Sequence, residues 1–341
     1  MMRRNDFSYR DRFSYAIRWA RFIPWMLLIT VFMAVLGGCG GRIGVVQKAA
    51  EEDVKDALFP TRIVSLLPSN TELLAALSAT DRLVCVTSND TYPPDVTRLP
   101  YVGDMTVNGE AVLACAPDLV LASPYQEEDV VPFLRRSGIP VLVVPEARNL
   151  TDIVTALVEV GRAIGADDRA QAVAAHLTTV LETFSLPDGV REGEPRIWLE
   201  IAPPPELYTA GGDTFLGEAL RRAGGRGLAD AETGWPLWSA EDVLAKDPDI
   251  ILLLHHAYPD VRARAQEEQD RPRPVRKAPP DVVARLAERP GWAKISAIRH
   301  ESVYVLDEDI FSRPTPRLIE ALPELAYVLA GMKADAAEDG R

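Results

Sequence analysis

Two adjacent histidines, His255 and His256, are the residues of this chain best placed for metal chemistry. They follow the apolar run 250–254, which predicts a buried strand whose end could bring a side chain into a cleft. A neutral imidazole at that point could coordinate an exposed metal ion. A polar strand end that hydrogen-bonds a loop is the simpler alternative and the more common one. The pair is therefore a weak candidate for a metal contact.

Motifs of known catalytic chemistry are absent from the sequence. It contains no Gly-x-Ser-x-Gly, no phosphate-binding loop, no His-Glu-x-x-His and no Gly-x-Gly-x-x-Gly. Of the other histidines, His176 falls within a helical pattern and His300 lies beside a strand start. No cluster of Cys and His has the spacing of a structural zinc site. We therefore expect a protein that is not an enzyme and carries no cofactor of its own.

The motif Leu-Gly-Gly-Cys that ends at Cys39 indicates a covalent modification instead. Residues 1–21 are basic and the short apolar run 25–36 follows, whereas a membrane-spanning helix needs about 20 apolar residues. This order is typical of a secretory signal, here with a lipoprotein cleavage site. We expect residues 1–38 to be removed, Cys39 to be lipidated outside the cytoplasm, and residues 39–60 to form a tether. A transmembrane anchor with a chance cysteine is the alternative.

Composition and charge limit the partners. The formal net charge is −13 and 47% of the residues are hydrophobic, which indicates an acidic globular protein. Acidity argues against nucleic acid as a partner and is compatible with docking on a basic surface. Cys85 and Cys115 could form a disulfide in an oxidising compartment or remain two buried thiols.

The first part of the expected mature chain, 61–148, alternates short apolar runs with helical patterns, as βαβ units do. Ser69 and Glu72 have the spacing of a capping box at the start of the first helix. We predict strands at 62–66, 83–87, 119–122 and 141–144, with helices that begin at 68, 108 and 129.

A helical connector and a second lobe follow. Apolar residues recur at helical spacing over 149–185, which predicts one long helix of about 50 Å, although Gly161 and Gly165 could interrupt it once. In the second lobe, 195–333, residues 259–280 are almost free of apolar side chains and predict a mobile surface excursion. Strands are expected there at 196–201, 250–254 and 302–306, and helices at 214–223 and 316–330.

These elements predict an α/β fold of two Rossmann-like lobes joined by a long backbone helix. Ligands in such folds bind at the carboxyl ends of the strands, so the ligand cleft should lie between the lobes.

Five stretches carry a resemblance to a known family. They are Arg62-Ile-Val-Ser-Leu-Leu-Pro-Ser-Asn-Thr-Glu-Leu, Thr91-Tyr-Pro-Pro, Pro117-Asp-Leu-Val, Gly234-Trp-Pro and Phe311-Ser-Arg-Pro-Thr-Pro-Arg. Over 61–330 the chain resembles the helical-backbone class (class III) of periplasmic binding proteins, and within it the cobalamin binders of vitamin importers. The resemblance implies a monomer that delivers a metal chelate to the permease and ATPase subunits of an ABC importer.

The resemblance also implies two docking residues. Family members meet arginines of the permease through one carboxylate on each lobe. These positions correspond to Glu110 and Glu241, each in the first turn of an expected helix. A glutamate there is also stabilised by the helix dipole without any partner, so the position alone does not establish docking.

For the ligand, the resemblance implies aromatic and arginine contacts. Where the family has first-lobe aromatics, this chain has Asn89, Ser123 and the neighbourhood of Met105, so haem or a ferric siderophore is an alternative to cobalamin or cobinamide. The candidate ligand residues are Trp235, Arg313, Tyr208, Asn89, Tyr92 and Phe311, with Tyr125 a weaker one and Phe311 equally compatible with the core.

Two further classes stay open. A binding protein for bare zinc or manganese would need several converging ligands, and only His255 and His256 are suitably placed. The other class is a lipoprotein that acts as a scaffold and takes no part in transport. Such a protein would keep the lipid anchor, but Glu110 and Glu241 would have no docking role.

Overall fold

The computed structural model describes residues 59–184, 194–254 and 274–338, with side chains up to residue 330. The chain divides into the units Met1–Leu58 and Phe59–Arg341, and all described residues belong to the second. Within the described residues, no helix combines the length and the apolar character needed to cross a membrane. The predicted signal segment, the lipidated Cys39 and most of the tether lie outside the described residues.

The N-terminal lobe is built on a parallel sheet of four strands in the order β2-β1-β3-β4. The strand order reverses between β1 and β3, and the ends of strands at such a reversal are where ligands bind in open α/β sheets. The strands are β1 (Ile63–Ser65), β2 (Leu83–Cys85), β3 (Leu119–Ala122) and β4 (Val141–Val143), and the helices are α3 (Pro68–Ala76), α4 (Gly109–Ala114) and α5 (Val130–Arg136).

The C-terminal lobe contains a five-stranded sheet in the order β10-β11-β9-β5-β7, parallel except for the edge strand β10. Strands β6 and β8 form a separate two-stranded antiparallel ribbon. The strands are β5 (Arg196–Glu200), β6 (Leu207–Tyr208), β7 (Arg226–Gly227), β8 (Leu237–Trp238), β9 (Ile250–Leu253), β10 (Val275–Lys277) and β11 (Val303–Leu306). The helices are α8 (Phe215–Arg222), α9 (Ala240–Lys246), α11 (Pro280–Ala287), α12 (Ser296–Arg299), α13 (Glu308–Phe311) and α14 (Pro316–Glu338).

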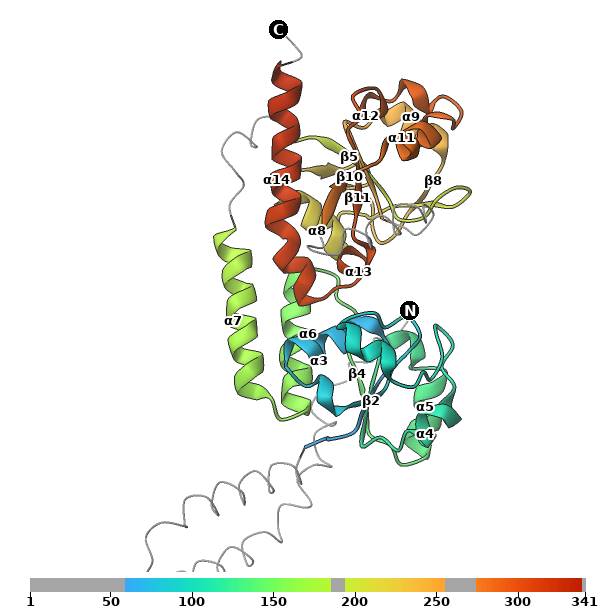
Figure 1. Cartoon of the computed structure of the whole chain (residues 1–341), viewed down its shortest axis with the longest axis vertical. Coiled ribbons are helices and arrows are strands. Elements are labelled where there is room, and N and C mark those ends of the chain that lie inside the picture. Colours follow the sequence, from blue (N-terminus) through green and yellow to red (C-terminus); the bar gives the residue numbers. More distant parts are fainter. Residues whose placement is uncertain (1–58, 185–193, 255–273, 339–341) are drawn as a thin grey trace, which may run out of the picture. The chain divides into compact units, whose positions relative to one another are not determined.

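The connector is a pair of helices, which corrects the expectation of one long helix. Helix α6 (Leu150–Ala163) ends before Gly165, whose φ of +70° favours glycine, and α7 (Asp167–Thr183) runs back along it (Figure 1). A Cβ added to Gly161 would lie 2.3 Å from the Cβ of Ala170. The missing side chain therefore lets the two helices approach closely at their turn.

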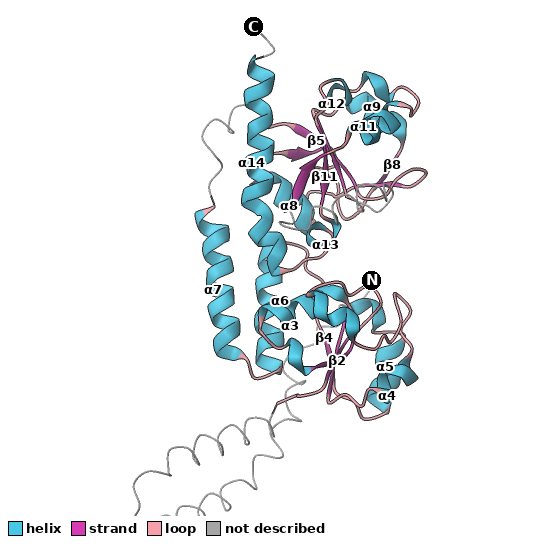
Figure 2. Cartoon of the chain, in the orientation of Figure 1, coloured by secondary structure: helices cyan, strands magenta, loops and turns pink. Residues whose placement is uncertain are grey.

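Helix α14 contacts both lobes and the connector. It packs against α3, α6, α7 and α8, and Figure 2 shows these helices on one side of the two sheets. The largest buried apolar cluster joins this layer to both sheets. Fully burying a Leu or Ile side chain contributes about 1.5–3 kcal/mol, so this shared core is a major reason why the lobes hold together.

Two other expectations need correction. Strand β10 lies inside the stretch 259–280 that was expected to be a surface excursion, and the side chain of Val275 is buried against the core. The predicted capping box of Ser69 and Glu72 is absent, because α3 begins at Pro68 and no side chain caps it. Glu72 is buried and has other partners.

Cys85 and Cys115 form a disulfide, with their Cα atoms 6.4 Å apart. This resolves the choice that the sequence leaves open. The bond ties the end of β2 to the end of α4 and closes a loop that contains residues of the cleft.

Candidate functional site

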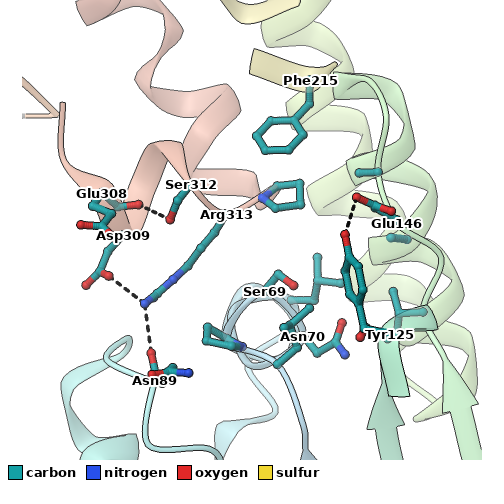
Figure 3. Close-up of a pocket in the computed structure, with 18 of the residues that line it drawn as sticks. Ser69, Asn70, Asn89, Tyr125, Glu146, Phe215, Glu308, Asp309, Ser312 and Arg313 are labelled. Carbon is teal, nitrogen blue, oxygen red and sulfur yellow. Dashed lines mark hydrogen bonds and ion pairs between the residues drawn. The ribbon is translucent and has the colours of Figure 1, made fainter. Parts of the chain in front are cut away.

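A cavity of about 680 Å³ lies between the two lobes, within the range of small-molecule sites. Its wall includes residues that follow β1, β2, β3 and β4 in the first lobe and β5, β9 and β11 in the second. Both sheets thus direct the carboxyl ends of their strands at the cavity, as expected for ligand sites in α/β folds. Figure 3 shows Ser69, Asn70 and Tyr125 facing Phe215 and Arg313 across it.

Local hydrogen bonds fix the first-lobe wall. The side-chain amide of Asn70 donates to the carbonyl of Ala122 at 3.2 Å, and that of Gln126 donates to the carbonyl of Leu66 at 3.2 Å. Ser123 N–H and hydroxyl both donate to Gln126 Oε1. The loops after β1 and β3 are therefore tied together at the point where the strand order reverses.

An aromatic face lies on the second-lobe side of the cavity. The rings of Trp235 and Phe215 meet edge to face with their centroids 5.6 Å apart, and both residues line the cavity. Trp235 is still 39% exposed, so part of its indole is available to a flat ligand. Stacking on such a ring adds to the free energy gained by burying apolar area.

Tyr125 is the aromatic residue of the opposite wall. Its hydroxyl donates to Glu146 Oε1 at 3.0 Å, as the dashed line in Figure 3 shows. Burial, followed by this hydrogen bond and the charge of Glu146, raises the pKa of the Tyr125 phenol above its usual 10. The phenol is thus protonated at neutral pH, as a hydrogen-bond donor.

Arg313 supplies the only guanidinium among the described residues of the cavity wall. Its Nη1 donates to Glu72 Oε1 at 2.9 Å, while Nη2 donates to Asp309 Oδ1 at 2.7 Å and to the carbonyl of Asn89 at 3.1 Å. Glu72 and Asn89 belong to the first lobe, whereas Arg313 belongs to the second. Much of the charge of Arg313 is therefore already neutralised.

Further contacts extend this network between the lobes. Arg317 donates from Nε to Glu72 Oε2 at 2.8 Å and from Nη2 to Oε1 at 2.5 Å, and its guanidinium stacks on the ring of Tyr92 at 3.9 Å. The Thr91 hydroxyl donates to Asp309 Oδ2 at 2.7 Å. We call this set the inter-lobe joint: Glu72, Asn89, Thr91 and Tyr92 of the first lobe with Asp309, Arg313 and Arg317 of the second.

The structure places the predicted ligand residues in three settings. Trp235, Arg313 and Asn89 line the cavity, as does the weaker candidate Tyr125. Tyr92 is engaged with Arg317 in the inter-lobe joint, and Tyr208 is half-buried in β6; neither is among the described residues of the wall.

Phe311 requires a correction, because it is 1% exposed and part of the apolar core. His255 and His256 lie outside the described residues, although Leu254, which precedes them, lines the cavity.

The two predicted docking glutamates are both exposed and in the first turn of a helix. Asn108 caps α4 by accepting from the N–H groups of Glu110 and Ala111, and Ser239 caps α9, which carries Glu241. Helices α4 and α9 belong to different lobes and lie on the side of the sheets opposite α7 and α14 (Figure 1). The disulfide at Cys115 links the end of α4 to β2. The short helix that carries Glu110 is therefore covalently attached to the sheet.

Some cavity residues escaped the sequence reasoning. Phe215, Glu146, Asp309 and Ser312 line the cavity, but nothing in their local pattern distinguishes them from helix and loop residues. Met105 and Ser123, where the family resemblance indicated lost aromatic residues, also lie on the wall. Tyr125 is accordingly the one aromatic side chain among the described residues of the first-lobe wall, which otherwise combines polar residues such as Asn70 and Asn89 with aliphatic ones such as Leu67 and Leu73.

Two α/β lobes that enclose a cavity from both sides are the arrangement of proteins that capture a small molecule between their lobes. The family described as "Periplasmic binding protein" matches residues 63–310, and the chain belongs to this family. It is a substrate-binding protein of ABC transporters.

Three known proteins illustrate the similarity. The "Uncharacterized ABC transporter substrate-binding lipoprotein YvrC" of Bacillus subtilis is 34% identical over 82% of this chain and 83% of its own length. The "Cobalamin-binding protein" of Halobacterium salinarum is 26% identical over 78% of this chain and 69% of its own. The structure of the "Periplasmic heme-binding protein RhuT" from Roseiflexus sp. RS-1 has a TM-score of 0.66 at 25% identity, over 80% of this chain and 98% of its own.

Proposed function

We propose that the chain is a lipid-anchored, extracytoplasmic protein that captures a corrinoid, cobalamin or cobinamide, and delivers it as a monomer to the permease of an ABC importer. The cavity between the lobes carries this proposal, because it combines an aromatic face with polar groups from both lobes. Relatives named for cobalamin binding support the choice of cargo. The relative named a lipoprotein supports acylation of Cys39.

The charges of the wall favour a cargo that is neutral or cationic. Of the described residues that line the cavity, Glu146, Glu308 and Asp309 are acidic and only Arg313 is basic. Arg313 already donates to two carboxylates. A haem would bring two propionates, which need cationic or hydrogen-bond donors, whereas a corrinoid presents mainly neutral amides on its rim. The amides could accept from Arg313 or donate to Asp309 and Asn89.

Capture in this proposal needs no covalent step. The corrin ring would lie against Trp235, and its amides would exchange hydrogen bonds with Asn89 and Arg313. The loaded protein would then dock through Glu110 and Glu241 on arginines of the permease. The ATPase subunits drive the separation of the lobes and the transfer of the cargo.

Haem is the second candidate, and one observation favours it. The Tyr125 hydroxyl lies on the cavity wall, and tyrosine is an axial ligand of haem iron in some proteins. Coordination as a phenolate would have to overcome the raised pKa of this phenol and its hydrogen bond to Glu146. A ferric ion could do so, and therefore haemin is a necessary arm of the test.

Isothermal titration of the full chain against cyanocobalamin, cobinamide, haemin and a panel of ferric siderophores tests the choice of cargo. We expect submicromolar binding of a corrinoid, weakened about tenfold or more in Trp235→Ala because the exposed stacking face is lost. Tyr125→Phe is the matched control, since it removes only the hydroxyl group and keeps the aromatic ring. Binding of haemin alone, lost in Tyr125→Phe, would replace the corrinoid by haem and leave the cavity as the site.

A further inference from the structure

Glu72 is the most deeply buried charged member of the inter-lobe joint. Only 2% of its surface is exposed, and both of its carboxylate oxygens accept hydrogen bonds from guanidinium groups. A buried carboxylate is tolerated only where cations and donors compensate the loss of water. In Glu72 that compensation comes from the other lobe, through Arg313 and Arg317.

The same contacts make the position of Arg313 in the cavity wall depend on the distance between the lobes. Arg313 lines the cavity and reaches Glu72, Asp309 and Asn89 with its two terminal nitrogens; Figure 3 shows two of these contacts, with Asn89 and Asp309. Moving the lobes apart would withdraw both guanidiniums from Glu72 and release Arg313 from its place in the wall. Glu72 therefore contributes both to the geometry of the cavity wall and to the closure of the lobes.

We propose that Glu72 is a positioning residue of the cleft, which holds Arg313 in the cavity wall and keeps the lobes closed, so that it sets how slowly cargo leaves. The effect on cargo rests on the proposed function, whereas the effect on the lobes does not. Separation of the lobes leaves a poorly solvated carboxylate and two cations, which opposes spontaneous release. In the importer, the separation of the lobes that the ATPase subunits drive breaks these contacts.

The C-terminal lobe offers a matched control. Glu200 is fully buried and is bound by Arg289 through two hydrogen bonds, of 2.6 and 2.8 Å. Both partners belong to the same lobe, and neither lines the cavity. Glu200→Gln therefore removes a buried charge paired with arginine, as Glu72→Gln does, but it leaves the contacts between the lobes intact.

Hydrogen exchange of the ligand-free full chain, followed by mass spectrometry, tests the closure. In Glu72→Gln we expect faster exchange confined to the facing segments, residues 87–92 and 309–317. Glu200→Gln should leave these segments unchanged relative to the rest of the chain. Equal exchange in the two variants, or a uniform increase across the chain in Glu72→Gln, would show that Glu72 serves stability only and would overturn the inference.

Cyanocobalamin release, measured by stopped-flow tryptophan fluorescence, tests the effect on cargo. We expect an off-rate about tenfold or more higher in Glu72→Gln, with a nearly unchanged on-rate, and no such change in Glu200→Gln. An unchanged off-rate would refute the positioning role. If the wild-type chain binds neither cyanocobalamin nor cobinamide, the choice of cargo fails, and the exchange experiment still decides the role of Glu72 in closure of the lobes.

A milder variant guards against misfolding of Glu72→Gln. Thr91→Val removes the 2.7 Å hydrogen bond to Asp309 and leaves the buried charges in place. The same two segments should exchange faster, with an off-rate raised a few-fold, because the loss of one hydrogen bond weakens the inter-lobe joint less. Unchanged exchange in both segments would count against the joint.

Discussion

Reduction of the Cys85–Cys115 disulfide should lower the free energy of unfolding by about 3.6 kcal/mol. The two cysteines are 30 residues apart, and the loss of loop-closure entropy for about 30 residues at 25 °C gives this magnitude. The bond acts mainly by restricting the unfolded chain. Its removal should therefore leave the folded cavity in place while the unfolded state gains conformational freedom.

The loss of stability on reduction should be concentrated in the loop between Cys85 and Cys115. Between the cysteines lie Asn89 and Met105, on the cavity wall, and the docking candidate Glu110. Few long secondary-structure elements hold this stretch, which contains the six-residue helix α4 and a 3₁₀ turn at Pro94–Arg98. The reduced protein should therefore unfold first in this part of the first lobe.

Differential scanning calorimetry of the oxidised and reduced full chain is the appropriate assay, because it measures the melting temperature and the enthalpy of unfolding directly. For a protein of this size the expected loss corresponds to about 7–14 °C in the melting temperature of the affected transition. The variant Cys85→Ala with Cys115→Ala controls for effects of the reductant. A shift below about 3 °C in both would refute the reasoning, since the cross-link would then not constrain the unfolded chain as its span requires.

Three other predictions test separate parts of the structure. Charge reversal of both Glu110 and Glu241 to Lys should abolish uptake by the importer while cargo affinity, measured by titration, is unchanged; an unchanged uptake rate would exclude docking through them. Burial raises the pKa of Asp90 above its usual 3.8, so the folded state binds the proton of Asp90 more tightly than the unfolded state does. The stability that this proton contributes is lost as the pH rises through the raised pKa. Asp90→Asn should therefore flatten the fall in unfolding free energy above about pH 4, measured by urea denaturation against wild type. Gly161→Ala should destabilise the chain by about 1–3 kcal/mol, because its Cβ would collide with that of Ala170; Ala170→Gly in the same chain should restore part of the loss, and no rescue would contradict that explanation.

The central strands β3 and β9 could be predicted from the sequence because all of their residues are buried. The predicted strand 119–122 coincides with β3, and the predicted strand 250–254 is one residue longer than β9. Such continuous apolar runs between turn residues are typical of parallel strands. Strand β10 escaped because it is an edge strand whose middle and last residues, Arg276 and Lys277, are charged, and its single buried side chain, Val275, leaves no periodic pattern.

Long-range contacts account for the other failures. Ser69 and Glu72 have capping-box spacing, and local reasoning cannot reveal that the partner of Glu72 lies 241 residues further along the chain. Likewise, Gly161 and Gly165 indicated a possible break in the connector, but the close approach of Ala170 made that break a tight turn between two helices. The cavity could be located from strand ends, whereas the residues that face it depend on the packing of both lobes.

The separation of 241 residues between Glu72 and Arg313 has a consequence for the order of folding. The described strands of the N-terminal lobe are complete at Val143, whereas Arg313 and Arg317 are synthesised long after it. Until they arrive, Glu72 lacks its cationic partners and must remain hydrated, so the first lobe matures with an incomplete surface. Domains generally fold in order of synthesis. Docking of α14 therefore follows the formation of the first lobe, and a chain truncated before Arg313 would lack the guanidinium contacts that join Glu72 to the second lobe.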